Sequence, residues 1–427
     1  MRHIEITKYS IYNLIRLQNH LMAYTIRKCR SCLSKNLSQV LSLGNQYLSD
    51  FRSNRTKPKK FPLDLIICTD CKLVQLKHNA PKKLLYSERY GYKSGINKTM
   101  NEELEGIVSQ SIKKIKNPGR EITVVDIGAN DGTLLKFYPK SYFRIGVEPV
   151  SKLAKECRKY ANSVVNDFFE YKSYEKKVGM RKAQIISAIS CFYDMEDPNK
   201  FLADIKKILA PDGIFIIQQN YLLEMLKKNA FDNIVHEHLE YYSLLSLENL
   251  LSKFDLEVFD LEIRDLNGGS FRTYICNKGT RKISAAVTKQ RLIEKKNKLE
   301  SKSTYSDFSK RVKDNANKIH EFIADKKRSG KTIYIYGAST RGNTLIQYLK
   351  LNNNLISAAV ERNPEKWGKY ISSASIPIIS EARARQEKPD YMLVLPWFFR
   401  DEFLIREKKY LELGGRFIFP LPSIKIV

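Results

Sequence analysis

The stretch Val124-Val125-Asp126-Ile127-Gly128-Ala129-Asn130-Asp131-Gly132-Thr133-Leu134-Leu135 decides the fold of this chain. Its β-branched residues, glycines and final apolar residues predict a buried strand, a glycine-rich turn and the start of a helix. Gly128 and Gly132 let the backbone approach a ligand closely, because no Cβ intrudes. Asp126 at the strand end favours a cationic ligand, and no Lys directly follows Gly132 as it would in a phosphate-binding loop.

The spacing D-x-G-x-x-x-G resembles motif I of class I S-adenosylmethionine (AdoMet) methyltransferases. Glu148 ends a second predicted strand 22 residues after Asp126, a spacing typical of ribose-binding acids. Asp167 follows a third predicted strand at residues 163–165, where the methyltransferase pattern has an acid that meets the adenine amino group. The alternative is an ordinary α/β turn with incidental acids. The AdoMet-binding residues that the resemblance implies are Asp126, Gly128, Asn130, Gly132, Glu148 and Asp167.

At 427 residues the chain should hold two or three domains, and the strand–turn–helix stretch above is typical of an α/β protein. Hydrophobic residues make up 43% of the chain, but no apolar run approaches the roughly 20 residues of a membrane span. Seven cysteines without a clear export signal favour a reduced, cytoplasmic protein. Met22 is an alternative start, so we expect residues 1–23 to be an N-terminal extension.

The formal net charge of +28 raises the question of a nucleic-acid partner. The lysines are dispersed along the chain, as in Lys82-Lys83 and Lys295-Lys296, and form neither a long basic block nor a basic tail. Many of them are therefore expected on solvated helix faces. An anionic substrate explains part of the charge more simply than nucleic acid, which we regard as an unlikely partner.

Cys29-x-x-Cys32 and Cys68-x-x-Cys71 form two pairs with 35 residues between the inner cysteines. Four thiolates on two turns match tetrahedral zinc, and the intervening residues can hold β-structure. The alternative is four reduced cysteines in turns. A site closed by four cysteines leaves no open position, so the expected zinc is structural, and it should stabilise a small module over residues 24–85.

His236-Glu237-His238 follows the fifth predicted strand, residues 214–218, and contains two of the six histidines. A histidine has an ordinary pKa of about 6.5, which suits proton transfer at neutral pH. The pattern H-x-H can also bind a metal, but no third ligand is evident nearby. The alternative is a pair of histidines at the edge of the core. We favour a catalytic role, because the cluster follows the sheet that carries the AdoMet-type loop.

Together these features resemble the nucleotide-sugar C-methyltransferases, which methylate a carbon of a 4-keto-deoxyhexose. That family joins a four-cysteine zinc module, a class I AdoMet domain of Rossmann-like fold and a second, C-terminal Rossmann-like domain. The likeness covers residues 27–427. It rests on Glu237-His238 and on four further stretches, Asn267-Gly268-Gly269-Ser270-Phe271-Arg272, Tyr336-Gly337-Ala338-Ser339-Thr340-Arg341-Gly342-Asn343-Thr344, Ala359-Val360-Glu361-Arg362-Asn363-Pro364 and Pro389-Asp390-Tyr391-Met392-Leu393-Val394-Leu395-Pro396-Trp397.

The resemblance implies that His238 removes a proton beside the ketone and that Glu237 orients or hydrogen-bonds nearby. It also implies that Tyr92 reaches the sugar or the AdoMet carboxylate; packing against the zinc module is the alternative for this tyrosine. Better-known members carry a His near the position of Phe192 and a Tyr near that of Val235. Tyr193 or His236 would then have to compensate, so the sugar stays open.

The C-terminal third begins with a long charged helical region, residues 284–324, which we expect to link the domains. A second Rossmann-like start follows, with Gly337-x-Ser339-x-x-Gly342 and then Glu361 after the next strand. We expect this domain on the substrate side of the active site, with Arg341 as a candidate phosphate contact. A degenerate sheet that once bound a cofactor is the alternative.

The predicted domains are a zinc module at residues 24–85, an AdoMet domain at 86–265, a linker and helical region at 266–330 and a C-terminal domain at 331–427. The predicted activity is AdoMet-dependent C-methylation of a nucleotide-sugar substrate by a monomer or weak oligomer without a membrane partner. A zinc-ribbon RNA methyltransferase and an inactive AdoMet-binding protein are the alternatives.

Overall fold

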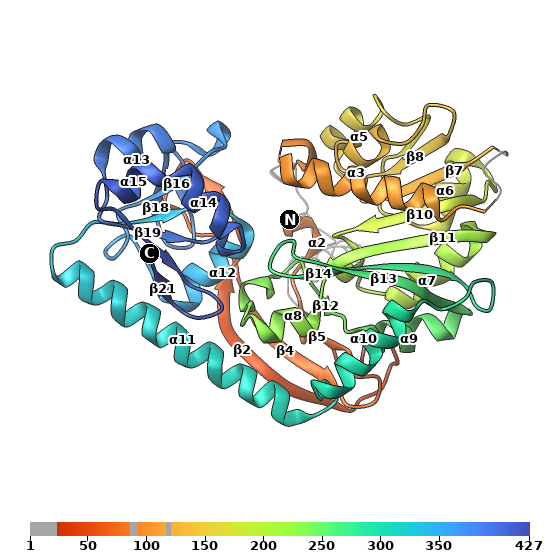
Figure 1. Ribbon diagram of the computed structural model, residues 1–427, viewed down its shortest axis with the longest axis horizontal. Coiled ribbons are helices and arrows are strands. Elements are labelled where there is room, and N and C mark those ends of the chain that lie inside the picture. The colour runs from red at the N-terminus through yellow and green to blue at the C-terminus, as the bar shows by residue number, and fades with distance from the viewer. Residues whose placement is uncertain (1–23, 86–92, 97, 117–120) are drawn as a thin grey trace, which may run out of the picture.

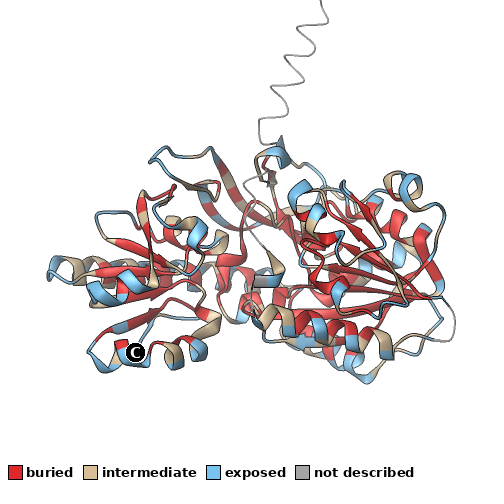
Figure 2. Cartoon of the chain, turned by 90° about the horizontal axis from the view of Figure 1, so that it is seen from above, coloured by how far each residue is buried: buried red, intermediate tan, exposed pale blue. Residues whose placement is uncertain are grey.

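The computed structural model describes residues 24–85, 93–96, 98–116 and 121–427. Two lobes stand side by side, and a long helix and a pair of long strands run beneath both (Figure 1). In each lobe the buried residues follow the sheet, and the exposed residues lie on the outer helices and loops (Figure 2). No helix among these described residues is both long and apolar enough to cross a bilayer.

The first lobe holds an open sheet in the spatial order β13-β14-β11-β10-β7-β8-β9. Its strands β7 to β11 are parallel, whereas β14 runs antiparallel to both β11 and β13. The chain order reverses between β7 and β10, and ligands bind beyond the carboxyl ends of strands at such a point. The strands are β7 (Thr123–Ile127), β8 (Phe143–Val147), β9 (Ser163–Val165), β10 (Ala183–Ile189), β11 (Leu209–Asn220), β13 (Leu256–Arg264) and β14 (Ser270–Asn277).

Helices cover both faces of this sheet (Figure 1). They are α3 (Lys98–Lys113), α4 (Thr133–Lys136), α5 (Ser151–Cys157), α6 (Tyr171–Val178), α7 (Pro198–Ile208), α8 (Leu222–Lys227), α9 (Leu244–Leu251) and α10 (Ala285–Lys296). The sheet extends past residue 265, where the AdoMet domain was expected to end, because β14 is one of its inner strands.

Strand β11 begins earlier than the sequence predicts. The predicted strand starts at residue 214, after Pro211-Asp212-Gly213, yet β11 already pairs with β10 at Leu209. The register then jumps between Ala183 and Ile185, so the extra residues form an irregularity within the strand. Pro211-Asp212-Gly213 is therefore part of the sheet.

The second lobe holds a sheet in the order β21-β20-β19-β15-β16-β18-β17-β3. Its strands are β15 (Ile333–Tyr336), β16 (Ala358–Glu361), β17 (Tyr370–Ile371), β18 (Ile376–Ser380), β19 (Tyr391–Val394), β20 (Arg416–Phe419), β21 (Lys425–Ile426) and β3 (Phe51–Arg52). Its helices are α12 (Thr340–Tyr348), α13 (Glu381–Glu387), α14 (Arg400–Arg406) and α15 (Lys408–Glu412). The expected second Rossmann-like start at β15 is present, and its neighbours β16 and β19 are parallel to it.

The helical region that the sequence predicts between the domains consists of two helices. α10 ends at Lys296 and α11 (Lys302–Arg328) begins after a break at which Lys298 has a φ of 51°. α10 packs on β13 of the first lobe, and α11 reaches the second lobe (Figure 1). No Gly or Pro marks the break, so the charge pattern alone could not reveal it.

The N-terminal module contributes to both lobes. Its sheet has the order β12-β5-β4-β2, so β12 of the first lobe completes it. Its strand β3 pairs with β17 at the edge of the second lobe's sheet. The module's elements are β1 (Tyr24–Thr25), β2 (Leu37–Tyr47), β4 (Lys60–Cys68), β5 (Val74–Leu76), β6 (His78–Asn79), β12 (Glu240–Tyr241) and the short helix α2 (Lys82–Leu85).

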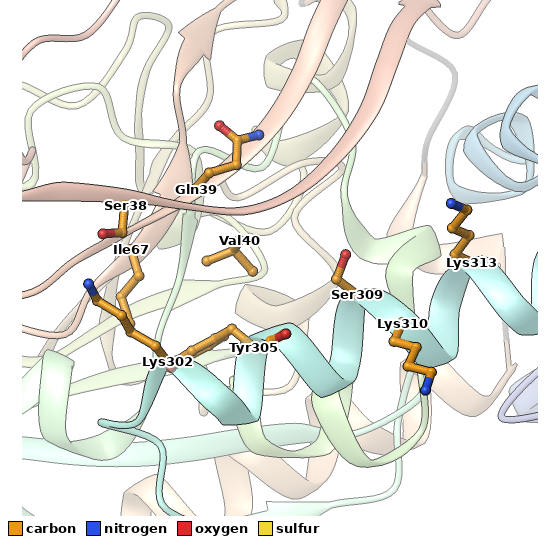
Figure 3. Close-up of a pocket in the computed structure, with 10 residues that line it drawn as sticks. Ser38, Gln39, Val40, Ile67, Lys302, Tyr305, Ser309, Lys310 and Lys313 are labelled. Atoms are coloured by element: carbon orange, nitrogen blue, oxygen red, sulfur yellow. The ribbon is translucent and has the colours of Figure 1, made fainter.

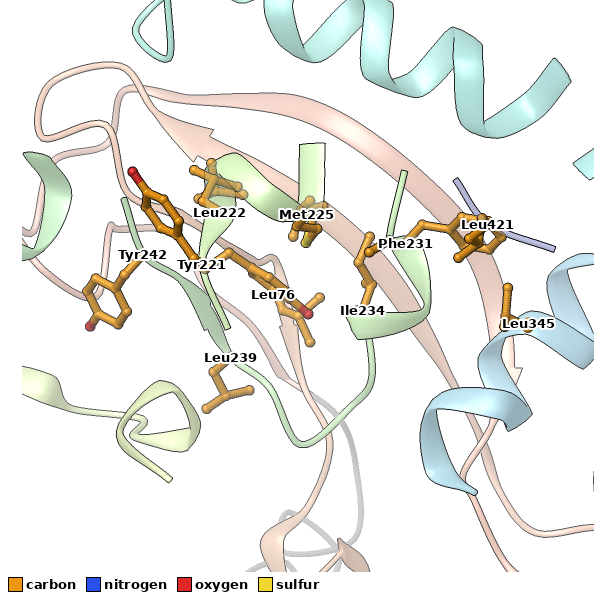
Figure 4. Close-up of a cluster of buried hydrophobic side chains, with 14 of the residues drawn as sticks. Leu76, Tyr221, Leu222, Met225, Phe231, Ile234, Leu239, Tyr242, Leu345 and Leu421 are labelled. Carbon is orange, nitrogen blue, oxygen red and sulfur yellow. The ribbon is translucent and has the colours of Figure 1, made fainter. Parts of the chain in front are cut away.

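One hydrophobic cluster joins the three parts (Figure 4). Leu76 comes from the zinc module, Phe231 and Ile234 from the first lobe, and Leu345 and Leu421 from the second, and all five side chains are buried. Full burial of one such side chain contributes about 1.5–3 kcal/mol to stability. The three parts are thus packed as one body around the segment that carries the candidate catalytic residues.

Candidate active site

The glycine-rich turn after β7 has the backbone that the sequence predicts. Gly128 and Gly132 adopt φ values of 73° and 83°, in the left-handed region that favours glycine. A Cβ on Gly132 would lie 2.9 Å from the Cα of Cys157, which is backbone and cannot move aside easily. Both glycines are therefore required by this turn.

Glu148, at the carboxyl end of β8, holds the same turn through backbone hydrogen bonds. Its carboxylate accepts the N–H of Asn130 at 2.9 Å and that of Val150 at 2.8 Å. Asp167 lies beyond β9, where its carboxylate is exposed and accepts a hydrogen bond from Ser173 at 3.1 Å. Both acids thus stand at the edge of the sheet where a nucleoside is expected.

Asp126 is buried at the end of β7, where the Ser187 hydroxyl donates to its carboxylate at 2.7 Å. Burial, with a smaller contribution from Glu148, raises the pKa of Asp126 to about 7. Burial likewise raises the pKa of Glu148. A bound cation would favour the ionised form of both groups, so this pair suits a positively charged ligand such as AdoMet.

The loop after β10 connects this turn to the histidine segment. The Cys191 thiol donates to the carbonyl of Ile127 at 3.1 Å. Two residues later, the ring of Tyr193 meets the imidazole of His238 edge-on at 4.3 Å between centroids. The N–H of Leu239 donates to the Tyr193 carbonyl at 2.8 Å. The same short loop therefore contacts both the AdoMet-type turn and His238.

His238 is held in one tautomer. Its Nδ1 lies 2.9 Å from the carbonyl oxygen of Asn233, and a carbonyl can only accept, so Nδ1 carries the proton. Nε2 is left with the lone pair. Burial, with a contribution from the positive charge of Arg341, lowers the pKa of His238 to about 3. The imidazole is thus neutral at physiological pH, and its Nε2 carries no proton.

The pKa of Glu237 shifts in the opposite direction to that of His238. Burial raises the pKa of its carboxyl to about 7, although part of the side chain remains exposed. The group is therefore present in both its protonated and its ionised form near neutral pH. A carboxyl with such a pKa can donate a hydrogen bond or accept a proton.

His236, the third member of the cluster, faces away from this pair. Its Nε2 donates to the carbonyl of Phe61 in the zinc module at 3.1 Å, and its ring meets that of Phe61 edge-on. Burial lowers the pKa of His236 to about 4. The side chain is 5% exposed and contacts the zinc module, so its catalytic role stays a prediction.

Phe192 and Val235, the two departures from the better-known members, are core residues. Phe192 is fully buried and packs edge-on against Phe201. Val235 is 3% exposed. Of the two residues that might compensate, only Tyr193 contacts His238. Tyr92, the remaining catalytic candidate, lies outside the described residues.

The four cysteines come together as predicted. The Sγ atoms of Cys29, Cys32, Cys68 and Cys71 all lie within 4.8 Å of one another. Cys29 and Cys71 are 3.5 Å apart, as are Cys32 and Cys68, close to the roughly 3.8 Å edge of a zinc tetrathiolate with Zn–S bonds of about 2.3 Å. The residues fit zinc, and four thiolates leave it no open position.

The two cysteine turns have matching backbones. Leu33 and Lys72, each just after the second cysteine of its pair, have a φ of 63°. Their N–H groups donate to the carbonyls of Cys29 and Cys68 at 3.0 Å. Gln75 donates its side-chain amide to the Cys29 sulfur at 3.2 Å. Such outer hydrogen bonds orient metal ligands, so the chain is pre-arranged for the ion.

The second glycine-rich loop, at Gly337-x-Ser339-x-x-Gly342, is held by a carboxylate of its own lobe. The carboxylate of Glu361 accepts the N–H of Ala338 at 3.0 Å, as Glu148 does with Asn130 in the first lobe. Glu361 also accepts two further backbone N–H groups and pairs with Lys366 at 3.4 Å. Arg341, the candidate phosphate contact, pairs instead with Asp232 of the first lobe at 2.6 Å.

A cavity of about 570 Å³ lies elsewhere, between β2 and α11 (Figure 3). Its lining includes Ser38, Ile67, Lys302, Tyr305 and Lys313. None of the predicted catalytic or AdoMet-binding residues belongs to it. It is therefore separate from the candidate active site.

Three family models match consecutive parts of the chain. A zinc binding domain matches residues 29–86, a methyltransferase domain residues 97–261, and a C-methyltransferase C-terminal domain residues 265–422. Together these matches identify an AdoMet-dependent C-methyltransferase. C-methyltransferase NovU of Streptomyces niveus is 29% identical over 413 residues, which are 94% of this C-methyltransferase and 97% of NovU.

Solved structures resemble part of this C-methyltransferase. The plantazolicin methyltransferase BpumL in complex with SAH is 12% identical and covers 41% of this chain and 82% of its own, with a TM-score of 0.33. The PH0226 protein from Pyrococcus horikoshii OT3 is 14% identical and covers 44% of this chain and 95% of its own, with a TM-score of 0.34.

The methyltransferase domain binds AdoMet, and the four-cysteine site is a zinc site.

Sequence reasoning missed three residues of this C-methyltransferase site. Asn233 acts through its backbone carbonyl, which no residue pattern reveals. No role was predicted for Cys191 or Asp232. The partner of Asp232 lies 109 residues away, so no local signal could have found it.

Replacement of Gly132 by Ala should weaken AdoMet binding at least tenfold, because Ala is strained at this φ and its Cβ meets backbone. Titration calorimetry with AdoMet would measure the loss. Gly106→Ala in α3 is the matched control, since a Cβ there meets nothing within 4 Å. Equal affinity of both variants would contradict the assigned role of the turn.

Purified protein should contain one zinc ion per chain by atomic emission spectroscopy. Cys71→Ser should lose the ion and at least about 3 kcal/mol of stability in thermal or urea unfolding, because metal binding stabilises the folded module. Cys276→Ala, a buried cysteine of β14 outside the cluster, should keep its zinc. Retention of a full equivalent by Cys71→Ser would rule out this site.

Proposed function

We propose that this C-methyltransferase methylates a carbon beside the ketone of a nucleotide-linked keto-deoxysugar. The family resemblance supports this substrate class, and the formal charge of +28 suits an anionic nucleotide diphosphate. The observation that carries the proposal is the fixed tautomer of His238, which presents a neutral basic nitrogen from a segment braced to the AdoMet-type turn.

His238 is the proposed base. A C–H next to a ketone is acidic enough for a positioned base to remove, and Nε2 is the nitrogen that is free to take the proton. The electron pair of the C–H bond moves into the enolate. The Asn233 carbonyl, which accepts from Nδ1, stabilises the imidazolium that forms.

Glu237 is the proposed hydrogen-bond donor to the developing enolate oxygen. With its pKa raised to about 7, the carboxyl is partly protonated at neutral pH, as a donor to an oxyanion must be. The proposed acid and base of enolisation are thus consecutive residues of one segment.

AdoMet supplies the methyl group: the enolate carbon forms the new C–C bond as the methyl–sulfur bond breaks and its electron pair stays on sulfur. The chain's contribution is to hold the sugar carbon in line with that methyl group, and such alignment alone can lower a barrier by several kcal/mol. The turn at Gly128 and Gly132 and the loop at Cys191–Tyr193 are the parts assigned to this alignment.

His238→Ala should abolish both methyl transfer and proton exchange. With methyl-labelled AdoMet and a panel of nucleotide-linked 4-keto-deoxysugars, we expect the rate to fall at least about 100-fold. In D2O the unmodified enzyme should also place deuterium on the sugar carbon, and the variant should not. His320→Ala, a histidine that bonds to Leu349 in the second lobe, is the control.

No transfer to any sugar of the panel, despite tight AdoMet binding, would contradict the substrate class. RNA should then be tested as the acceptor. If His238→Ala still transfers the methyl group to a sugar, the substrate class stands, but His238 is not the base.

The pH dependence separates the roles of Glu237 and His238. If Glu237 donates its proton, kcat should fall above about pH 7, because the donor is lost as the carboxyl ionises. Glu237→Gln keeps an amide donor at every pH, so its profile should be flat from pH 6 to 8.5. A kcat of the unmodified enzyme that rises through pH 7, together with loss of activity in Glu237→Gln, would instead make Glu237 the base.

A further inference from the structure

Arg341 and Asp232 form a buried ion pair where the two lobes meet. The guanidinium donates to one Asp232 oxygen from Nε at 3.0 Å and from Nη2 at 2.6 Å. The Asp232 side chain is fully buried, and that of Arg341 is 15% exposed. A pair of this kind is costly to break, because removal of one partner leaves an uncompensated buried charge.

Three of the stretches that carry the family resemblance converge on this pair. The carbonyl of Asn267 accepts from Nη1 of Arg341 at 2.5 Å, and the indole N–H of Trp397 donates to Asp232 at 3.2 Å. Gly268 has a φ of 87°, and a Cβ there would lie 3.1 Å from the Trp397 ring. These stretches therefore form one junction around Arg341.

The junction lies one residue from the group that fixes His238. Asp232 precedes Asn233, whose carbonyl accepts from Nδ1 of His238. Helix α12, which carries Arg341, makes two further contacts with the segment around Asn233. The Thr344 hydroxyl donates to the carbonyl of Ile234 at 3.1 Å. The ring of Tyr348 also meets that of Phe231 edge-on, at 5.1 Å.

We propose that Arg341 is a positioning residue for proton removal: by binding Asp232 it makes the second lobe set the place and tautomer of His238. The inference rests on the proposed function for the role of His238, but not for the geometry. The second lobe thereby helps to position the base. Arg341 itself touches neither the proton nor the methyl group.

The other groups around His238 come from the first lobe. The ring of Tyr193 contacts the imidazole from the loop after β10, and Tyr241 donates to the same Asn233 carbonyl at 3.3 Å. Glu237 is the neighbouring carboxyl on the same segment. Arg341 is the cation whose charge acts on His238 from the second lobe.

The test uses the full chain labelled with 15N-histidine, and His238→Gln assigns the signal among the six histidines. In the unmodified protein the His238 signal should show a proton on Nδ1 and none on Nε2, from pH 5.5 to 8. In Arg341→Gln that signature should give way to a mixture of tautomers that titrates within this range. The kcat for methyl transfer should fall at least about tenfold, with the KM for AdoMet unchanged.

Arg383→Gln is the matched control, because Arg383 is an exposed arginine of the second lobe that pairs with Glu387. It should leave both the signal and kcat unchanged. If Arg341→Gln does not fold, Arg341→Lys takes its place. This variant keeps the charge but cannot donate from both Nε and Nη2, so it should shift the tautomer signal and lower kcat.

An unchanged His238 signal and unchanged kcat in a folded Arg341 variant would overturn the proposal. Failure of the proposed function is a different outcome. In that case the unmodified protein methylates no sugar of the panel, while the histidine signal still reports whether Arg341 sets the tautomer.

Discussion

The zinc tetrathiolate is the constraint on which the rest of this molecule depends. Cys68 ends β4, and Cys32 lies just before β2, so the metal fixes one end of the long β2–β4 pair. The same pair extends to β3 and to Tyr47, whose N–H donates to Gln347 of the second lobe at 2.7 Å. A small metal site thus sets the relative placement of two large sheets, because the strands between them are paired along their length.

The chemistry at Glu237–His238 follows from burial acting on unlike groups. Desolvation disfavours charge, so it lowers the pKa of an imidazole and raises that of a carboxyl. His238 is therefore neutral, and Glu237 is partly protonated, near neutral pH. This pairing suits a reaction in which a proton leaves carbon while negative charge develops on a neighbouring oxygen.

Local pattern predicted most of the first lobe. Strand β9 has the predicted bounds, since a short run of β-branched and apolar residues specifies a buried parallel strand. The zinc ligands and the glycine turn were also readable, because each depends on residues close in sequence. The start of β11 was not, since its pairing with β10 overrides Pro211-Asp212-Gly213. The tautomer of His238 and the Arg341–Asp232 pair depend on tertiary contacts that no spacing encodes.

The pairing of β3 with β17 has a consequence for how the chain is made. β3 lies near residue 51 and β17 near residue 370, so the second lobe's sheet is finished by a strand that is synthesised more than 300 residues earlier. During translation the N-terminal strands emerge long before their partners and expose unpaired edges, which are prone to aggregate. Zinc loading on the nascent module, which needs only residues up to Cys71, would order those strands while the rest of the chain is still being added. The metal thereby links the order of synthesis to the final assembly of the enzyme.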